Sequence, residues 1–339
     1  PWHRVDPKAD FTQQFRLADL APASNYVLNI EYAAKKGKDT KTLVGSFRTA
    51  PASSTIAPIT FTVSTGQRYT DLDSKDGFKI YDQMRKLDPN FFVHTGDIVY
   101  YDVLAKTPAL ANWHWQRTYS LNSAVRFHNN VSSYFIKDDH DTLVNDSWPT
   151  MKTTYMGDLT FERGVEIFRE QVPMGDKTYR TIRWGKDLQI WMVEGRDFRS
   201  PNTMKDGPDK TIWGAEQLAW FKRTVEESDA TFRILISPTP VVGPDRTQVP
   251  NVAADELRHL GIDDAAVLDV ARKIRKPIDA RAEIRIRQVS GRRNEACDID
   301  LGAPIEEDSR RVHQVDLAVG QKRPVDLRRS RRRNMIEHP

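Results

Sequence analysis

The sequence is poor in cysteine. Cys297 is the single thiol among 339 residues, which excludes an intramolecular disulfide framework and any zinc site built from several cysteines. A metal bound by this chain would therefore need oxygen and nitrogen ligands. We interpret Cys297 as an incidental thiol.

Long apolar runs are also missing. Hydrophobic residues make up 39% of the chain, and no run approaches the roughly 20 apolar residues that a membrane-spanning helix needs. Residues 1–4 contain nothing that resembles the apolar segment of a signal peptide. We therefore expect no membrane span and find no signal peptide in this sequence.

Aromatic side chains are absent after Phe232. Residues 246–339 contain no Phe, Tyr or Trp, whereas arginine is dense, above all at 328–333. A segment without aromatics has little with which to build a core. We predict a separate Arg-rich tail over 246–339, disordered or loosely helical, with a candidate helix at 255–274. Translation of the gene in a shifted frame would also produce this composition.

The net charge of +4 comes from that tail. Residues 246–339 carry 20 Lys and Arg against 16 Asp and Glu, and the rest of the chain is balanced at 31 against 31. An Arg-rich tail could neutralise nucleic-acid phosphates, but it lacks interleaved aromatics for base stacking. We therefore rank nucleic-acid binding by the tail low.

The first fifty residues have the pattern of antiparallel β structure. Strand-like runs occur at 11–16, 26–32 and 43–49. The segment before Tyr26 resembles the crossover of fibronectin type III domains, where a Leu-x-Pro turn precedes a tyrosine corner. We predict a partial fibronectin III-like β domain over 1–50 and a Pro- and Ser-containing linker over 51–58.

From residue 59 onward strands and helices alternate, which favours an α/β fold with a parallel sheet. The expected elements are strands at 59–64, 91–94 and 232–237, helices at 75–87 and 216–226, and a hairpin over 179–193. The first helix has Ile80, Met84 and Leu87 on one face and Asp73 or Ser74 as its cap. We place this α/β core at 59–245.

Acidic residues follow two strand-like runs near the centre of the chain. The run at 91–94 leads into Asp97, and a run at 134–136 leads into a group of carboxylates that contains Asp139 and His140. The carboxyl ends of neighbouring parallel strands meet at one edge of a sheet, so we expect these side chains to converge. Carboxylates with one imidazole suit metal-assisted phosphoester chemistry.

The residue types alone leave alternatives open. Asp97 can bridge two cations or simply close a turn, and Asp139 can hold a second cation. Tyr100 could place a phenolate on a trivalent ion or pack within its loop. His140 could face a substrate or only bond a neighbouring carboxylate, and its flanking acids favour the first reading.

A family resemblance narrows these alternatives. The motifs at 96–100, 138–141, 197–199 and 213–221 occur in the order and rough spacing of the alkaline phosphatase D family of metallophosphatases. The resemblance covers about residues 11–245. It implies an α/β metallophosphatase sandwich of mixed sheets flanked by helices. The implied activity is hydrolysis of phosphate mono- and diesters, usually outside the cytoplasm, with iron and calcium as metals.

The resemblance also implies roles for individual residues. Asp97 would be the bridging metal ligand, Tyr100 an iron ligand and Asp139 a ligand of the second site. His140 would be the catalytic residue beside the phosphate. The remaining assignments are substrate binding for Arg199 and Asn145 and a supporting role for Asp197, although an Asp197–Arg199 surface salt bridge would explain that motif equally well.

Two parts of the sequence depart from the family pattern. Residues 64–67, after the first strand, offer only hydroxyl and amide oxygens where the family often has Cys or Asp. The family's distal Asn-His and Gly-Asp-x-His segments are missing beyond residue 245, where His259, His313 and His338 stand alone. We expect their loss to weaken a two-metal site.

The alternative function is a non-catalytic scaffold. Such a protein would bind phosphorylated or glycosidic ligands through Arg199 and the Trp-His-Trp run at 113–115. Core packing of that run is the plainer explanation.

Overall fold

The computed structural model describes residues 2–34, 38–205, 207–239, 287–288 and 312–318. Most of the tail at 246–339, including the helix expected at 255–274, lies outside the described residues. Two short strands of the tail, β9 (Arg287–Gln288) and β10 (Val312–Ala318), are described.

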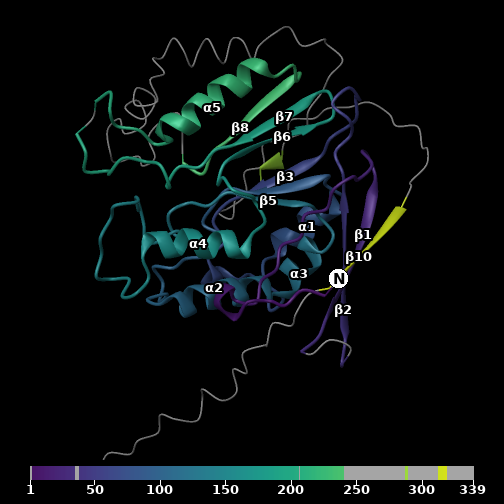
Figure 1. Cartoon of the computed structure of the whole chain (residues 1–339), viewed down its shortest axis with the longest axis horizontal. Helices are drawn as coiled ribbons and strands as arrows, with labels where there is room; N and C mark the ends of the chain where they lie inside the picture. Colours follow the sequence, from purple (N-terminus) through teal and green to yellow (C-terminus); the bar gives the residue numbers. More distant parts are fainter. Residues whose placement is uncertain (1, 35–37, 206, 240–286, 289–311, 319–339) are drawn as a thin grey trace, which may run out of the picture.

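Two β-sheets lie face to face at the centre of the molecule (Figure 1). The first sheet has the order β5-β4-β3-β9 and is parallel throughout. The second has the order β6-β7-β8, with an antiparallel and a parallel pair. Besides β9, their strands are β3 (Phe61–Ser64), β4 (Phe91–His94), β5 (Ser133–Phe135), β6 (Arg180–Trp184), β7 (Leu188–Met192) and β8 (Phe232–Ile236).

Alternation of side chains along the strands builds the core between these sheets. In β4, Phe91 and Val93 point toward the second sheet, and in β7 Ile190 and Met192 point back toward the first. The intervening residue Phe92 packs on the opposite side, against helices. This period of two is the pattern of a strand that is buried on both faces.

Helices cover the outer faces of both sheets (Figure 1). Two of them, α1 (Lys79–Lys86) and α3 (Asn122–His128), pack on the β4 side through Tyr81, Met84 and Phe127. On the β7 side, α5 (Gly214–Glu227) packs through Phe221 against Trp191. The expected mixed α/β fold with flanking helices is confirmed.

Several local predictions are also confirmed. Strands β3 and β4 are parallel neighbours with α1 between them in sequence, and β6 and β7 form the expected hairpin. The helix expected at 75–87 begins later, at Lys79, and ends at Lys86. The N-cap residue is Phe78 and not the expected Asp73 or Ser74, although the Asp73 carboxylate accepts the Lys79 backbone N–H at 2.8 Å.

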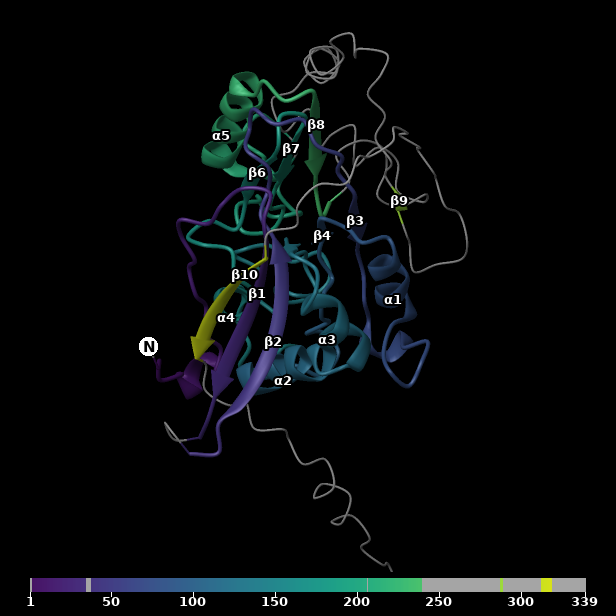
Figure 2. The same ribbon diagram turned by 90° about the vertical axis from the view of Figure 1, so that its right-hand side faces the viewer.

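A third sheet, β10-β1-β2, lies beside the helical side of the sandwich (Figure 2). Here β1 (Asn25–Tyr32) and β2 (Lys41–Arg48) are antiparallel, and the Ser46 N–H donates to the Asn129 carbonyl beyond α3. The Tyr26 hydroxyl accepts the Ala21 N–H at 2.7 Å, the contact that defines a tyrosine corner. The fibronectin III-like assignment itself stays a prediction.

The strand expected at 11–16 is wrong. Phe11 has a φ of 57°, which interrupts any extended run. The Gln14 side-chain amide donates to the carbonyl oxygens of Arg169 at 2.6 Å and Val172 at 3.1 Å. The segment therefore caps the carboxyl end of a helix, α4 (Phe161–Gln171), instead of pairing with a strand.

Two helices, α4 and α2 (Pro108–Tyr119), were not predicted from the sequence. These helices form a cluster with the loops after β4 and β5, in which Trp115 is 1% exposed. His114 is equally buried, so two of the three residues at 113–115 are unavailable to a glycosidic ligand. Among the described residues, no helix is long and apolar enough to cross a membrane.

Helix α4 lies tightly against the loop after β5. A Cβ added at Gly164 would come 1.7 Å from the Thr142 carbonyl oxygen, which is far inside van der Waals contact. Helix propensity alone favours alanine over glycine by about 1 kcal/mol. At Gly164 the tight packing outweighs this preference, because the helix or the loop would have to move to admit a Cβ.

We predict that Gly164→Ala lowers the free energy of unfolding by about 2–3 kcal/mol, because overpacking displaces a helix. Urea denaturation followed by circular dichroism measures this. The matched control is Gly207→Ala, where an added Cβ meets nothing within 4 Å. A Gly164→Ala protein as stable as the wild type would contradict the tight packing.

His94, the last residue of β4, is fully buried, and its ring lies parallel to the Phe135 ring at 6.4 Å. Burial, with a smaller contribution from His128, lowers the pKa of His94 to about 3. The folded protein thus keeps this imidazole neutral, whereas an unfolded chain protonates it near pH 6.5. Its contribution to stability is complete above pH 6.5 and is lost as the pH falls toward 3.

We predict that the free energy of unfolding falls by about 2 kcal/mol more between pH 7 and pH 5 in the wild type than in His94→Leu. Urea titrations of both proteins at the two pH values measure the difference. The comparison does not depend on whether the variant is less stable overall. Equal pH dependence in the two proteins would show that folded His94 takes up a proton.

Candidate functional site

Two loops carry the acidic residues, one after β4 and one after β5. The strands are parallel and paired at His94 and Phe135, so the chain leaves both at the same edge of the sheet. The loops approach so closely that a Cβ at Gly96 would lie 2.6 Å from the Asp138 Cβ. Gly96 also has a φ of 107°, which favours glycine.

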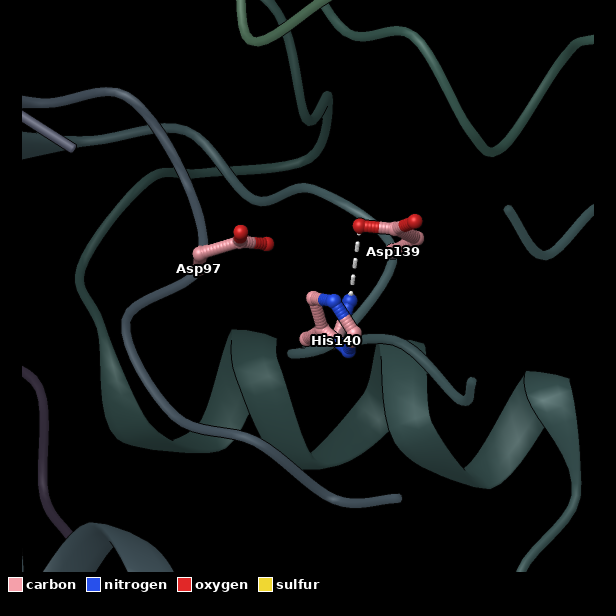
Figure 3. A group of neighbouring side chains, drawn as sticks. All are labelled: Asp97, Asp139 and His140. Carbon is pink, nitrogen blue, oxygen red and sulfur yellow. Dashed lines mark hydrogen bonds between the residues drawn. The ribbon is translucent and has the colours of Figure 1, made fainter. Parts of the chain in front are cut away.

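Asp97, Asp139 and His140 come together at this edge, as Figure 3 shows. One ligand atom from each of the three side chains lies within 4.8 Å of the others. Asp97 comes from the β4 loop, and Asp139 and His140 come from the β5 loop. The convergence expected from the sequence is confirmed.

Asp141 links the loop after β4 to the loop after β5. Its carboxylate is fully buried and accepts the Asp138 backbone N–H at 2.6 Å and the Ile98 backbone N–H at 3.1 Å. Burial first, and then the charge of Asp97, raises the pKa of Asp141 well above its ordinary value. The two donors belong to different loops, so this side chain links the loop of Asp97 to the loop of Asp139, as does the Tyr101 N–H, which donates to the His140 carbonyl oxygen at 2.8 Å.

Arg196, from the loop after β7, holds the β5 loop. Its guanidinium pairs with Asp138 at 2.6 Å and lies 3.6 Å from the Asp139 carboxylate. Burial alone would raise the pKa of Asp139, but the charges of Arg196 and His140 lower it below its ordinary value. The backbone N–H groups of His140 and Asp146 also donate to Asp139. Asp139 is therefore held as a carboxylate in one orientation.

Asp97 is in a different electrostatic environment. Burial first, and then the charges of Asp138 and Asp139, raises its pKa to about 7. Its Oδ1 is buried and has no hydrogen-bond partner among the described residues. The backbone φ of 54° is uncommon for a residue with a side chain. Asp97 is thus a buried carboxylate that neighbouring negative charges destabilise and that has one oxygen without a hydrogen-bond partner among the described residues. A bound cation would stabilise its charged form.

His140 is oriented by two contacts. Its Nδ1 lies 2.7 Å from the Asp102 carboxylate, and its ring stacks on Tyr100 at 4.4 Å. Burial alone would lower the pKa of His140, but the hydrogen bond with Asp102 and the charges of Asp139 and Asp97 raise it to about 9. The Tyr100 hydroxyl donates to Asp97 at 3.2 Å, which places both rings beside the carboxylate group.

A buried ion network beneath the site was missed by the sequence analysis. Lys137 is fully buried and pairs with Glu194 at 2.9 Å and Asp197 at 2.6 Å. Burial alone would lower the pKa of Lys137, but those two acids raise it. The network joins the β5 and β7 loops. The sequence feature that could have revealed this network is a charged residue directly after an apolar run, as at Lys137 and Glu194.

The remaining predicted residues lie around this core. Asp197 pairs with buried Lys137, and its carboxylate also accepts a hydrogen bond from Thr178. Asn145 is exposed and donates to Asp146, whose backbone contacts Asp139. Arg199 is half-buried in the loop after β7. Their substrate-binding and supporting roles stay predictions.

The loop after β3 faces the site with backbone more than with side chains. The Gly66 and Gln67 N–H groups donate to the Gly96 and Asp97 carbonyl oxygens. The Gln67 side chain turns inward, where its amide bonds the hydroxyls of Tyr81 and Tyr119. Gln67 is thus occupied in the core, and the Asp97–Asp139–His140 group contains no residue of this loop.

The donor set fits a metal ion. Two carboxylates and one imidazole converge within 4.8 Å, one carboxylate oxygen is buried without a hydrogen-bond partner among the described residues, and like charges raise the pKa of Asp97. Carboxylate oxygens suit a hard divalent or trivalent cation. The two carboxylates could form part of a two-metal ligand set, with the His140 imidazole beside it.

Comparison with known families identifies one match. A sequence model described as PhoD-like phosphatase matches residues 61–258, more than half of the chain. This match begins after the N-terminal β-sheet and ends inside the predicted tail. No curated protein matches the chain.

Solved structures give a second comparison. The chain is similar to one described as "Structure of PhoD", with a TM-score of 0.57 and 17% identity over 73% of this chain and 56% of that one. At that identity the likeness shows a shared fold, and this chain spans about half of that protein. A purple acid phosphatase from yellow lupin (Lupinus luteus) seeds aligns with a TM-score of 0.44 and 13% identity, over 65% of this chain and 38% of that one.

We predict that Asp141→Asn weakens binding of a divalent cation by about 10–100-fold, as measured by titration calorimetry with Ca²⁺. The amide offers one acceptor where two backbone donors must be satisfied, so one loop is released. Asp229→Asn, at a carboxylate on the protein surface paired with Arg183, serves as the control. Unchanged Ca²⁺ affinity in a folded Asp141→Asn protein would show that this contact does not organise the site.

Proposed function

This chain belongs to the PhoD-like phosphatase family, and from that premise we propose that it hydrolyses phosphate esters at the Asp97–Asp139–His140 group with bound metal ions. The observation that carries the proposal is the convergence of these three side chains at the carboxyl ends of two parallel strands. That placement is where α/β folds assemble their chemistry.

The proposed ligand roles follow the resemblance. Asp97 would be the bridging ligand, Tyr100 an iron ligand and Asp139 a ligand of the second metal site. The 3.2 Å contact between the Tyr100 hydroxyl and Asp97 supports a shared role for these two residues. When bound, the cations would neutralise phosphoryl oxygens and activate a water for attack.

His140 would act on the substrate. Its Nδ1 is engaged by Asp102 at 2.7 Å, which leaves Nε2 as the ring nitrogen for a substrate oxygen. Asp102 holds the ring in one orientation, and Tyr100 stacks on its face. A histidine held in this way can keep a proton beside the oxygen of the leaving alcohol.

The substrate would be a small-molecule or polymeric phosphoester, reached outside the cytoplasm. Arg199 and Asn145 would contact it, with Asp197 fixing the loop after β7 through Lys137. The part of the chain in which the resemblance would place the distal metal ligands lies outside the described residues. We propose that the lack of matching histidines there weakens metal binding and so limits turnover.

We predict that Asp97→Asn lowers metal affinity at least about 100-fold and abolishes hydrolysis, because it removes the bridging charge. His140→Gln should retain the metal and lower kcat by about 10²–10⁴-fold, because it removes only proton transfer. Metal content by mass spectrometry and turnover of p-nitrophenyl phosphate measure the two effects separately.

Asp229→Asn is again the control, because it removes an aspartate remote from these loops. Loss of metal in His140→Gln would reassign that residue as a ligand. If the wild-type protein contains stoichiometric iron or calcium but does not turn over substrate, the proposed hydrolase activity is overturned. The non-catalytic scaffold then remains as the explanation.

A further inference from the structure

A short turn at residues 153–158 lies against the segment that begins at Asp102. The Tyr155 hydroxyl donates to the Asp102 carbonyl oxygen at 2.7 Å, and the Asp158 backbone N–H donates to the Lys106 carbonyl oxygen at 2.9 Å. The Lys106 ammonium lies 4.9 Å from the centre of the Tyr155 ring. We call residues 153–158 the strap, because they contact both ends of that segment.

The strap is itself anchored in the core. Met156 is fully buried, and Leu159, directly beyond the strap, is buried in the same cluster as Ala105. Gly157 has a φ of 56°, and a Cβ there would lie 2.7 Å from the Lys106 carbonyl oxygen. Glycine therefore permits the close approach of the strap to the segment that follows Asp102.

Asp102 depends on its backbone for its position. Its Oδ2 lies 2.7 Å from the Nδ1 of His140, and its Oδ1 is buried and has no hydrogen-bond partner among the described residues. Leu104, two residues further on, is 65% exposed and so adds little to the packing of this segment. The Tyr155 hydroxyl contacts the backbone of Asp102 directly, where such support has the most effect.

We propose that the strap positions His140 through Asp102, with Tyr155 as the positioning residue. The Tyr155 hydroxyl holds the Asp102 carbonyl group, and the Asp102 carboxylate holds the His140 ring. The proposal rests on the proposed function, in which His140 keeps a proton beside the leaving alcohol. It deepens that function, because it makes proton transfer depend on a loop that contributes no metal ligand.

Leaving-group dependence tests the proposal. Phenyl phosphate needs a proton on its leaving oxygen more than p-nitrophenyl phosphate does, because phenol is the weaker acid. In Tyr155→Phe we expect kcat to fall about tenfold for phenyl phosphate and about threefold or less for p-nitrophenyl phosphate, with KM and metal content unchanged. An equal fall for both esters overturns the proposal, as does a change confined to KM.

A double-mutant cycle tests the route through Asp102. In an Asp102→Ala background, Tyr155→Phe should change kcat less than about twofold, because no carboxylate remains to be positioned. Additive effects of the two changes would show that Tyr155 acts by another route. The control is Tyr26→Phe, which removes another tyrosine–backbone hydrogen bond of 2.7 Å, in the third sheet. It should leave the ratio of the two kcat values at the wild-type value.

The motion of the His140 ring separates failure of the strap from failure of the proposed hydrolysis. Carbon-13 relaxation of histidine-labelled protein, with Ca²⁺ as the added metal and the His140 signal identified from its loss in His140→Gln, gives the order parameter of the ring. We expect it to fall in Tyr155→Phe and in Asp102→Ala but not in Tyr26→Phe, even if no ester is turned over. An unchanged order parameter in Tyr155→Phe overturns the proposal even if esters are hydrolysed.

Discussion

The Asp141 carboxylate is the contact on which the site depends. It accepts backbone N–H groups from Ile98 and Asp138, which follow different strands. Asp139 is also held by Arg196 and by backbone N–H groups of its own loop. Asp141 thus links the two loops, and Gly96 allows their close approach.

The charges around Asp141 explain why the pKa of Asp139 is lowered whereas that of Asp97 is raised. Arg196 and His140 lower the pKa of Asp139, whereas Asp97 is beyond the reach of the arginine's ion pairs and is raised by burial and by its neighbours. The fully buried pair of Lys137 and Glu194 joins the second sheet to the same loops. A buried ion pair is weak evidence for stability, but removing one partner leaves a charge without compensation. We therefore interpret these pairs as devices that fix geometry.

Tyr100 separates two environments of opposite charge. On one side lie the carboxylates with His140, and on the other lie Arg117 and Arg68.

Period-two patterns and glycines predicted much of this fold. The strand–helix–strand unit before Asp97, the hairpin over 179–193 and the parallel arrangement all follow from local residue order. The segment at 11–16 has a strand-like pattern but forms no strand. Its Gln14 side chain instead donates to carbonyl groups at the carboxyl end of α4, which is more than 150 residues away in sequence. Helix α4 has an amphipathic pattern, with Phe161, Ile167 and Phe168 buried, that was available in the sequence, whereas apolar and polar residues are mixed around α2.

The sequence by itself determined the residues at the active edge, since an acidic residue after a buried strand must emerge at that strand's carboxyl end. It also determined the expected meeting of Asp97 with Asp139 and His140. Only the tertiary structure decided which charges hold them: Lys137, Arg196 and Glu194 act through partners in loops that follow other strands. It also decided that Arg117 faces a pocket next to Tyr100. Spacing along a chain encodes local geometry, whereas ion pairs between sheets depend on distances that only packing sets.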